Sequence, residues 1–199
     1  TNTYQPAEDI TTSLTLAILK GDVGVWEYVG SKVDQIKISG SAGNPITVTF
    51  TISAKDLSLT SVTNTTTILN ALTTDDSAPK ILFSDLEFKM GAQASALSGL
   101  AELSISSFEI VIKNNLDTDT YDSTSGANII EQLRKSPREV FLNFTVPRLT
   151  ATAYETWHAA KTPLHAYLLF TDGTYQYDFH FPKLTITSVI DNVKGENIT

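Results

Sequence analysis

Residues 46–53 read ITVTFTIS, and every second residue of this stretch is apolar while those between are Thr or Ser. Ile46, Val48, Phe50 and Ile52 therefore share one face of a β-strand, because successive strand side chains point to opposite sides. β-branched and aromatic residues are also the ones that strands favour. The stretch predicts a strand with one buried apolar face and one threonine-rich face.

The same alternation recurs along the chain and predicts an all-β fold. Asp172-Gly173 predicts a two-residue hairpin turn between strands at 165–171 and 174–181. A longer loop at 40–45 and a turn at 21–24 separate other strands. The further alternating sets are Leu14, Leu16 and Ile18; Val140, Leu142, Phe144 and Val146; and Tyr175, Tyr177, Phe179 and Phe181.

Two apolar stretches change phase partway. In 81–90 the apolar set shifts after Ser84-Asp85, and in 103–112 it shifts across Ser106-Ser107. A shift of one residue moves the buried face to the other side of the strand. Each stretch is therefore a candidate β-bulge or a candidate bend between two sheets.

Two short helices and two loops complete the expected organisation. The first helix is predicted at 126–134, with Ile129, Ile130 and Leu133 on one face, and the second at 151–160. Residues 54–80 are rich in Thr and poorly periodic, so we expect a long protruding or disordered loop. Residues 114–125 form a second, acidic loop.

The second helix has an expected cap and an expected buried face. Thr150 or Thr152 is the expected cap, and Thr152 lies at capping-box spacing from Glu155. The residues expected to face the sheet are Ala153, Tyr154, Trp157 and Ala160.

These elements predict a mainly β fold, a β-sandwich or barrel of antiparallel strands with two short flanking α-helices. The length of 199 residues fits a single domain over 1–199, with the long loop at about 54–80. The chain begins at Thr1 without a methionine, so we expect a processed product or a fragment of a longer chain.

Composition and charge exclude several classes of protein. The formal net charge is -8, whereas a protein that grips DNA phosphates is normally basic. The same charge disfavours anionic membranes, and no apolar run is long enough to span a bilayer. The chain has no cysteine, which excludes disulfides and thiolate metal sites.

No set of residues forms a recognisable catalytic, cofactor or metal motif. The histidines lack the spacing of a zinc site, and neither G-x-S-x-G nor a phosphate-binding glycine loop occurs. An acidic trio in the second loop lacks the glycine and the ligand order of an EF-hand. We therefore predict no catalytic, cofactor-binding or metal residues, no cofactor and no small-molecule substrate. The residues considered are His158, His165 and His180; Asp117, Asp119 and Asp122; and the chance N-x-[ST] matches at Asn64, Asn143 and Asn197.

The aromatic residues allow two interpretations. Core packing is the simpler one, because their spacing is that of strands and of a covering helix. A platform that stacks on sugars is the alternative, and exposure of Tyr175 and Tyr177 would favour it. A hydrolase with a dispersed site would require a pocket in which His165 or His180 lies beside a buried carboxylate. The aromatic set is Trp26, Tyr28, Trp157, Tyr167, Tyr175, Tyr177, Phe179 and Phe181.

Two stretches and their order resemble one known family. Residues 25–40, VWEYVGSKVDQIKISG, lead into PITVTFTI at 45–52, and ISSFEIVIKNNL follows at 105–116. Together with the helices, the 140–146 strand and the final hairpin, they resemble the tail tube proteins of long-tailed (siphovirus-type) bacteriophages over roughly 11–190. Members of that group often carry about a hundred further residues before the matching region.

The resemblance implies a non-enzymatic structural subunit of the virion tail. Its copies would form rings, typically hexameric, that stack into a hollow tube, with sheets of neighbouring subunits joined edge to edge around the lumen. DNA would pass through without specific binding, other tail proteins would be partners, and the protein would be made in the bacterial host cytoplasm. The threonine and serine faces of 46–53 and 31–39, with Asp34, would suit a polar, acidic inner wall, and the 54–80 loop would suit contact with an adjacent ring or subunit. The alternative is a monomeric β-sandwich binding module, for instance for carbohydrate.

Overall fold

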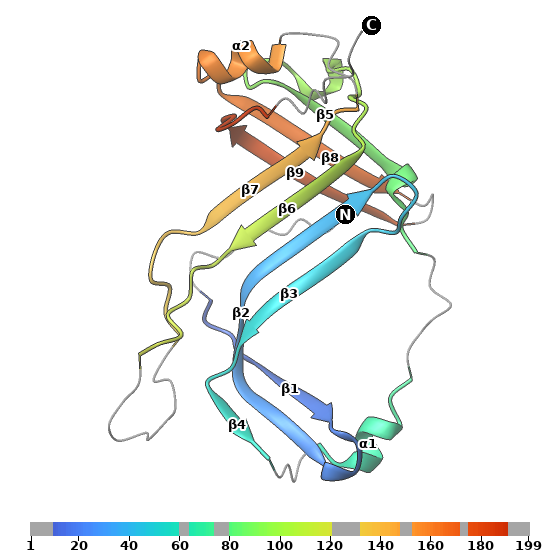
Figure 1. Cartoon of the computed structure of the whole chain (residues 1–199), viewed down its shortest axis with the longest axis vertical. Coiled ribbons are helices and arrows are strands. Elements are labelled where there is room, and N and C mark those ends of the chain that lie inside the picture. The colour runs from blue at the N-terminus through green and yellow to red at the C-terminus, as the bar shows by residue number, and fades with distance from the viewer. Residues whose placement is uncertain are drawn as a thin grey trace, which may run out of the picture. The chain divides into compact units, whose positions relative to one another are not determined.

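The computed structural model describes residues 10–59, 64–73, 80–120, 132–147, 153–171 and 175–190. The fold is mainly β, as predicted, with two antiparallel sheets and, in these residues, no closed barrel (Figure 1). Short 3-10 helices occupy Gly21–Val23, Phe83–Asp85 and Leu97–Gly99. The other elements are β1 (Leu14–Leu19), β2 (Val25–Ser41), β3 (Thr47–Ser53), β4 (Asp56–Ser58), α1 (Thr66–Asn70), β5 (Leu86–Ala92), β6 (Ser107–Lys113), β7 (Glu139–Thr145), α2 (Ala153–Ala159), β8 (Leu164–Thr171) and β9 (Gln176–Leu184).

The chain forms two compact units. The first contains β1, β3, β4, α1 and most of β2, β6 and β7. The second contains β5, β8, β9, α2 and the remaining ends of β2, β6 and β7. The single domain expected over 1–199 stays a prediction, because a division by contacts does not test whether the units fold separately.

The larger sheet is organised around β2, which is 17 residues long. Its first part pairs with β1 and β4, its second part pairs with β3, and the sheet continues from β2 to β6 and β7. Figure 1 shows the arrows of β3, β2, β6 and β7 alternating in direction, as an antiparallel sheet requires. Gly21 and Gly24 have φ of 50° and 114°, which confirms the predicted turn between β1 and β2.

The predicted strands at 46–53 and 140–146 are present as β3 and β7, but the expected buried face is wrong for β3 and holds only in part for β7. Val48, Phe50 and Ile52 are 49%, 54% and 36% exposed. Val140 of β7 is 40% exposed, and Leu142 and Phe144 are half-buried. Alternation fixes which side chains share a face, whereas burial also requires another element to cover that face.

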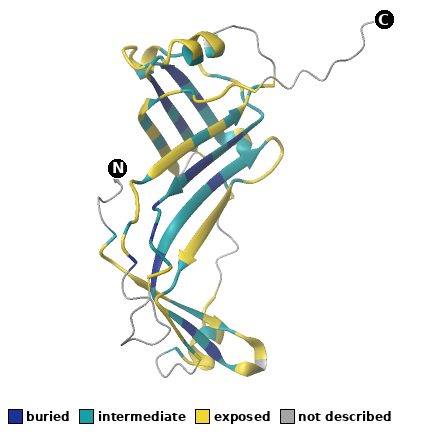
Figure 2. Ribbon diagram, turned by 60° about the vertical axis from the view of Figure 1, so that its left-hand side comes forward, coloured by how far each residue is buried: buried dark blue, intermediate teal, exposed yellow. Residues whose placement is uncertain are grey.

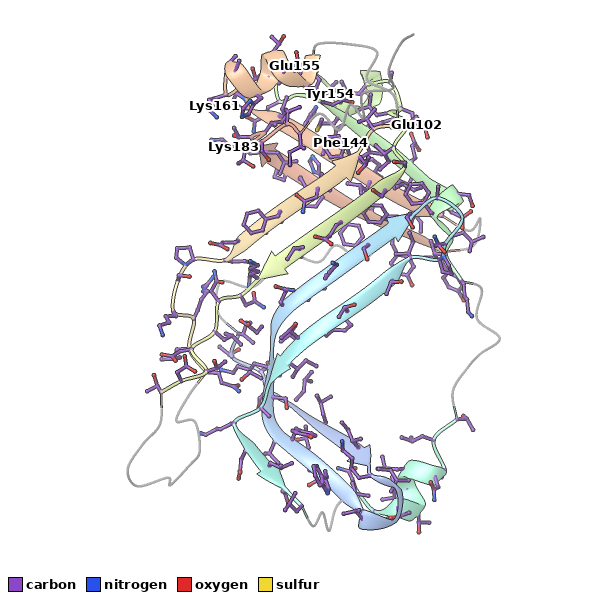
Figure 3. The ribbon with its side chains drawn as sticks, viewed as in Figure 1. Glu102, Phe144, Tyr154, Glu155, Lys161 and Lys183 are labelled. Carbon is purple, nitrogen blue, oxygen red and sulfur yellow. The ribbon has the colours of Figure 1, made fainter. Side chains whose placement is uncertain are left out.

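The core of the second unit lies on one face of the sheet β5-β8-β9. Phe88 and Met90 of β5 and the alternate residues of β8 from Leu164 to Phe170 are buried there. Aromatic rings extend this core from Phe88 to Phe144, with centroids 5.1 Å apart, and on to Tyr154, 6.0 Å further (Figure 3). Of the aromatic residues considered for core packing, Trp157 packs on Tyr154 and Phe179 on Phe170, whereas Tyr175 and Tyr177 are exposed, so the interpretation holds in part.

The phase changes mark places where the chain changes partner. Residues 81–82 pair with 45–46, a 3-10 turn follows at 83–85, and only then does β5 begin, so 81–90 contains no β-bulge. Residues 102–103 pair with the edge of β5, whereas β6 begins at Ser107 in the larger sheet. The bend between two sheets is therefore confirmed for 103–112.

The helix and loop predictions hold in part. α2 confirms the helix at 151–160, although Ala160 is exposed, and the expected cap at Thr150 or Thr152 lies outside the described residues. In the helix predicted at 126–134, residues 126–131 lie outside the described residues and 132–134 are not helical, because Arg134 bridges Leu116. The loop at 54–80 contains β4 and α1, so the expectation of no regular structure is wrong there.

The final hairpin is confirmed as the antiparallel pair β8–β9, in which Thr171 lies opposite Gln176. The Asp172-Gly173 turn lies outside the described residues. The loop at 40–45 is confirmed between β2 and β3. Within the described ranges, no helix is both long and apolar enough to cross a membrane.

Candidate assembly surface

The first candidate surface is the free edge of β3. This strand pairs with β2 on one side, and no other described strand pairs with it. Its sequence TVTFTIS contains no charge, proline or glycine, which are the devices that normally protect an edge from pairing with another chain. Val48 and Phe50 add exposed apolar side chains to the unpaired backbone, and Figure 2 shows the β3 ribbon in the colour of exposed residues along most of its length. The β3 edge therefore lacks the features that normally prevent an edge from pairing with another strand.

The opposite edge of the same sheet is β7, which follows β6 in the strand order. Like β3 it is seven residues long, and Val140 and Phe141 are 40% and 43% exposed. Ile38 of β2 and Ile110 of β6, by contrast, are buried. Beside these two buried positions, β3 and β7 both carry exposed apolar side chains.

One face of the sheet, here called the polar face, is largely hydrophilic. The register of β2 with β3 places Lys37 opposite Thr49. Glu109 accepts an ion-pair contact from the Lys37 ammonium and a 3.4 Å hydrogen bond from the Asn143 amide, so β6 and β7 contribute to the same face. The polar face consists of Gln35, Lys37, Ser39, Thr47, Thr49, Thr51, Glu109, Lys113, Glu139, Phe141, Asn143 and Thr145, together with the apolar Val111.

The charges on this face are balanced across neighbouring strands. The Lys37 hydrogen bond is the main reason that the pKa of Glu109 lies below its usual value. Lys113 lies over the Phe141 ring, 5.4 Å from its centroid. The contacts of Glu109 with Asn143 and of Ser107 with Thr145 define an antiparallel register that puts Glu139 opposite Lys113. Each lysine of the polar face thus has a carboxylate on an adjoining strand.

The Asp34 side chain is bound to the backbone of a neighbouring segment, and its expected place on an inner wall stays a prediction. Its carboxylate accepts a 2.9 Å hydrogen bond from the Leu116 amide, and its backbone carbonyl accepts one from Asn114. Asn114 is buried, donates to the Val33 carbonyl and accepts from the Arg138 guanidinium at 2.7 Å. These contacts connect residues 114–116 and Arg138 to β2.

The buried side chains around Asn114 were missed by sequence reasoning. Lys32 donates to the Gln132 carbonyl, and the Gln132 amide donates to Ser53 at 2.8 Å. Lys32 and Gln132 are both buried. Gln132 follows Lys32 by 100 residues and Ser53 by 79 residues in the sequence. The one available sequence signal was a polar residue within a strand pattern, which does not distinguish a buried position from an exposed one.

The three histidines lie on separate elements. His158 of α2 contacts the Thr187 carbonyl at 3.1 Å, and His180 of β9 is exposed. His165 is buried, and its Nε2 atom makes no hydrogen bond to the described residues. In the described ranges no three His, Asp or Glu residues come together in a way that could hold a metal ion.

The acidic trio and the glycosylation matches have local structural roles where they are described. The Asp117 carboxylate accepts hydrogen bonds from the Asp119 amide and the Thr120 hydroxyl, and the first of these is the main cause of its lowered pKa. Asp122 and Asn197 lie outside the described residues. Asn64 donates to Glu27, and Asn143 lies within β7.

Tyr175 and Tyr177 are 58% and 55% exposed. Tyr177 lies opposite Phe170, whose side chain belongs to the buried face of the second sheet. The two tyrosines thus continue the apolar face of that sheet to a point where it is no longer covered. This exposure is the feature that would favour a binding module.

The comparisons with known proteins agree with the resemblance of the sequence. A family model described as phage tail tube protein matches residues 3–196. Among curated proteins, none matches the chain.

Proposed function

The chain belongs to the phage tail tube protein family, and we propose that its copies self-assemble into stacked rings that enclose a channel for DNA. Membership of the family supports a structural role in the virion tail. Hexameric rings, contacts with other tail proteins, passage of DNA without specific binding, the absence of a catalytic role and synthesis in the bacterial host cytoplasm are parts of this proposal.

The observation that carries the proposal is that β3 and β7 are both edge strands of one sheet and that β3 carries no residue that protects its edge. An edge that pairs with a different edge of the next copy makes a head-to-tail contact, and such contacts close into a ring when the rotation between copies allows it. β3 and β7 run in opposite directions in Figure 1. Pairing β7 of one copy with β3 of the next therefore continues the antiparallel alternation around the ring.

The two edge strands also match in length and pattern. A full-length antiparallel alignment pairs Thr49 with Asn143 on the polar face and Phe50 with Leu142 on the apolar face. A shift by one residue would put polar side chains opposite apolar ones. A shift by two residues would keep the faces matched but would leave two residues of each seven-residue strand unpaired. The unshifted register is therefore the expected one.

In this proposal the polar face lines the channel. Its hydroxyl, amide and charged side chains are the kind that protein surfaces present to water. Thr and Gln side chains hydrogen-bond to water, and a wall without excess positive charge gives DNA phosphates no counterion-release gain.

The 54–80 region is our candidate for contact between rings. It carries β4 and α1, and Leu57, Leu59, Ile68 and Leu72 are 42%, 55%, 48% and 68% exposed. Apolar side chains exposed together in this way indicate an interaction site.

Electron microscopy of the concentrated protein, with light scattering for mass, tests assembly directly. Rings or tubes are expected. In the same preparation, the cysteine-free chain allows a register test with Thr49→Cys and Asn143→Cys, because directly opposed strand residues come close enough for a disulfide. The pair should crosslink copies in assembled material. Thr47→Cys with Asn143→Cys is the shifted control, and preferential crosslinking of that pair would reject the unshifted register.

The exposed Tyr175 and Tyr177 favour one alternative, a monomeric module that binds carbohydrate. The family match does not support it. A chain that stays monomeric at high concentration and binds an oligosaccharide, with affinity lost in Tyr177→Thr, would replace the tube proposal by this one.

A further inference from the structure

The polar face carries Lys37, whose positive charge must be neutralised by a nearby carboxylate if DNA is to move along this face without binding to it. Lys37 lies on a middle strand of the sheet, and its side chain is 42% exposed. Any cation of a subunit is repeated in every copy of a ring and in every ring of a stack. Phosphate contacts multiply in their effect on DNA affinity, because each one releases counterions. An unpaired ammonium at this position would therefore make the channel wall bind the phosphates of DNA.

Glu109 is positioned to prevent this. It lies on β6, the strand next to β2, and pairs directly with the Lys37 ammonium. The Asn143 amide on β7 holds the same carboxylate from the other side, at 3.4 Å. The pKa of Glu109 is lowered, chiefly by the hydrogen bond from Lys37, so the carboxylate is ionised at every pH at which tails operate near neutrality.

Folding does not account for this arrangement. The Lys37 and Glu109 side chains are 42% and 33% exposed, and exposed ion pairs contribute little to stability. β3, the strand on the other side of β2, carries only Thr, Ser, Val, Phe and Ile. β3 therefore places no charged residue beside Lys37. Among the strands that adjoin β2 here, Glu109 of β6 is the residue that neutralises the Lys37 charge.

We propose that Glu109 is the residue that keeps the polar face from retaining DNA, by neutralising Lys37 in every copy. The proposal rests on the proposed function, in which the polar face lines the channel. Without this carboxylate, each copy would present one uncompensated ammonium to the DNA. The face would then bind the phosphate backbone in a sequence-independent and salt-sensitive way.

The test is retention of a short labelled DNA duplex by assembled protein, measured by co-sedimentation at low and high salt. Glu109→Gln keeps the size of the side chain and removes its charge. It should retain at least about tenfold more DNA than the unaltered protein near 50 mM salt, and the excess should vanish at several hundred millimolar. The double variant Lys37→Gln with Glu109→Gln should return to the original level.

Glu155→Gln is the matched control, because it removes one carboxylate from an exposed position on α2 (Figure 3). Equal retention by Glu109→Gln and Glu155→Gln would overturn the proposal, as would high retention by the double variant. If Glu109→Gln does not assemble, the same comparison on protein immobilised at high density decides between these outcomes. Failure of the unaltered protein to form rings would instead reject the proposed function, and this inference with it.

Discussion

Replacing Phe50 by threonine should disrupt assembly while leaving the subunit folded. Threonine suits a strand as well as phenylalanine does and continues the composition of β3. Phe50 is 54% exposed in one copy, so much of its side chain contributes nothing to the stability of that copy. Its remaining surface is available to the neighbouring subunit, where Leu142 is the expected partner.

The magnitude follows from the exposed area. A phenylalanine that is about half exposed offers about 100 Å² to a neighbour, which is worth about 2.5 kcal/mol at about 25 cal/mol/Å². The smaller threonine side chain would bury only a small part of this apolar area, so most of the free energy would be lost. Each contact between copies should therefore weaken by about 2 kcal/mol, or about 30-fold in its association constant.

The assay is the concentration dependence of mass by light scattering, together with thermal unfolding of the dilute subunit. We expect the assembly threshold to rise strongly and the unfolding temperature to change little. Tyr177→Thr is the matched control, because Tyr177 is 55% exposed on β9, an edge strand of the other sheet. Equal loss of assembly in both variants would refute the assignment of β3 as the contact edge, and unfolding of the Phe50 variant would refute the argument from exposure.

Three further predictions concern the fold and the polar face. Gly40→Ala should destabilise the protein by about 1–3 kcal/mol in urea unfolding, because the new methyl group would lie 2.6 Å from the Ile46 side chain; unchanged stability would show that the contact relaxes freely. Asn114→Ala should cost about 1–3 kcal/mol, since it removes the buried Asn114 amide and leaves the half-buried Val33 carbonyl without its side-chain donor, and chemical denaturation with Asn143→Ala as the exposed comparison measures it. Because the folded-state pKa of Glu109 is depressed, the small stabilisation from its ion pair should persist above the ordinary glutamate pKa and disappear as the pH falls through the lower folded value; NMR titration of the carboxyl carbon checks this, and a normal or raised pKa would contradict it.

The candidate site was only partly visible in the sequence. The alternation of 46–53 predicted the strand and its two faces, and the register with β2 agrees with that division. The pairing of Glu109 with Lys37 was not predictable, because 72 residues separate the two and strand order is not a local property. The same holds for the hydrogen bond from the Leu116 amide to the Asp34 carboxylate, which joins residues 82 positions apart in the sequence.

The sequence by itself determined the mainly β class, most strand positions, the second short helix and the absence of thiol chemistry. Each of these follows from period-two patterns, capping and turn residues or composition, which act over a few neighbouring residues. Only the tertiary structure decided which apolar faces are covered. Val48 and Ile110 occur in equally regular strands, yet one is 49% exposed and the other fully buried. The physical reason is that burial depends on the neighbours on both sides of a strand, and β3 lies at an edge whose neighbour is, in our proposal, another copy of the chain.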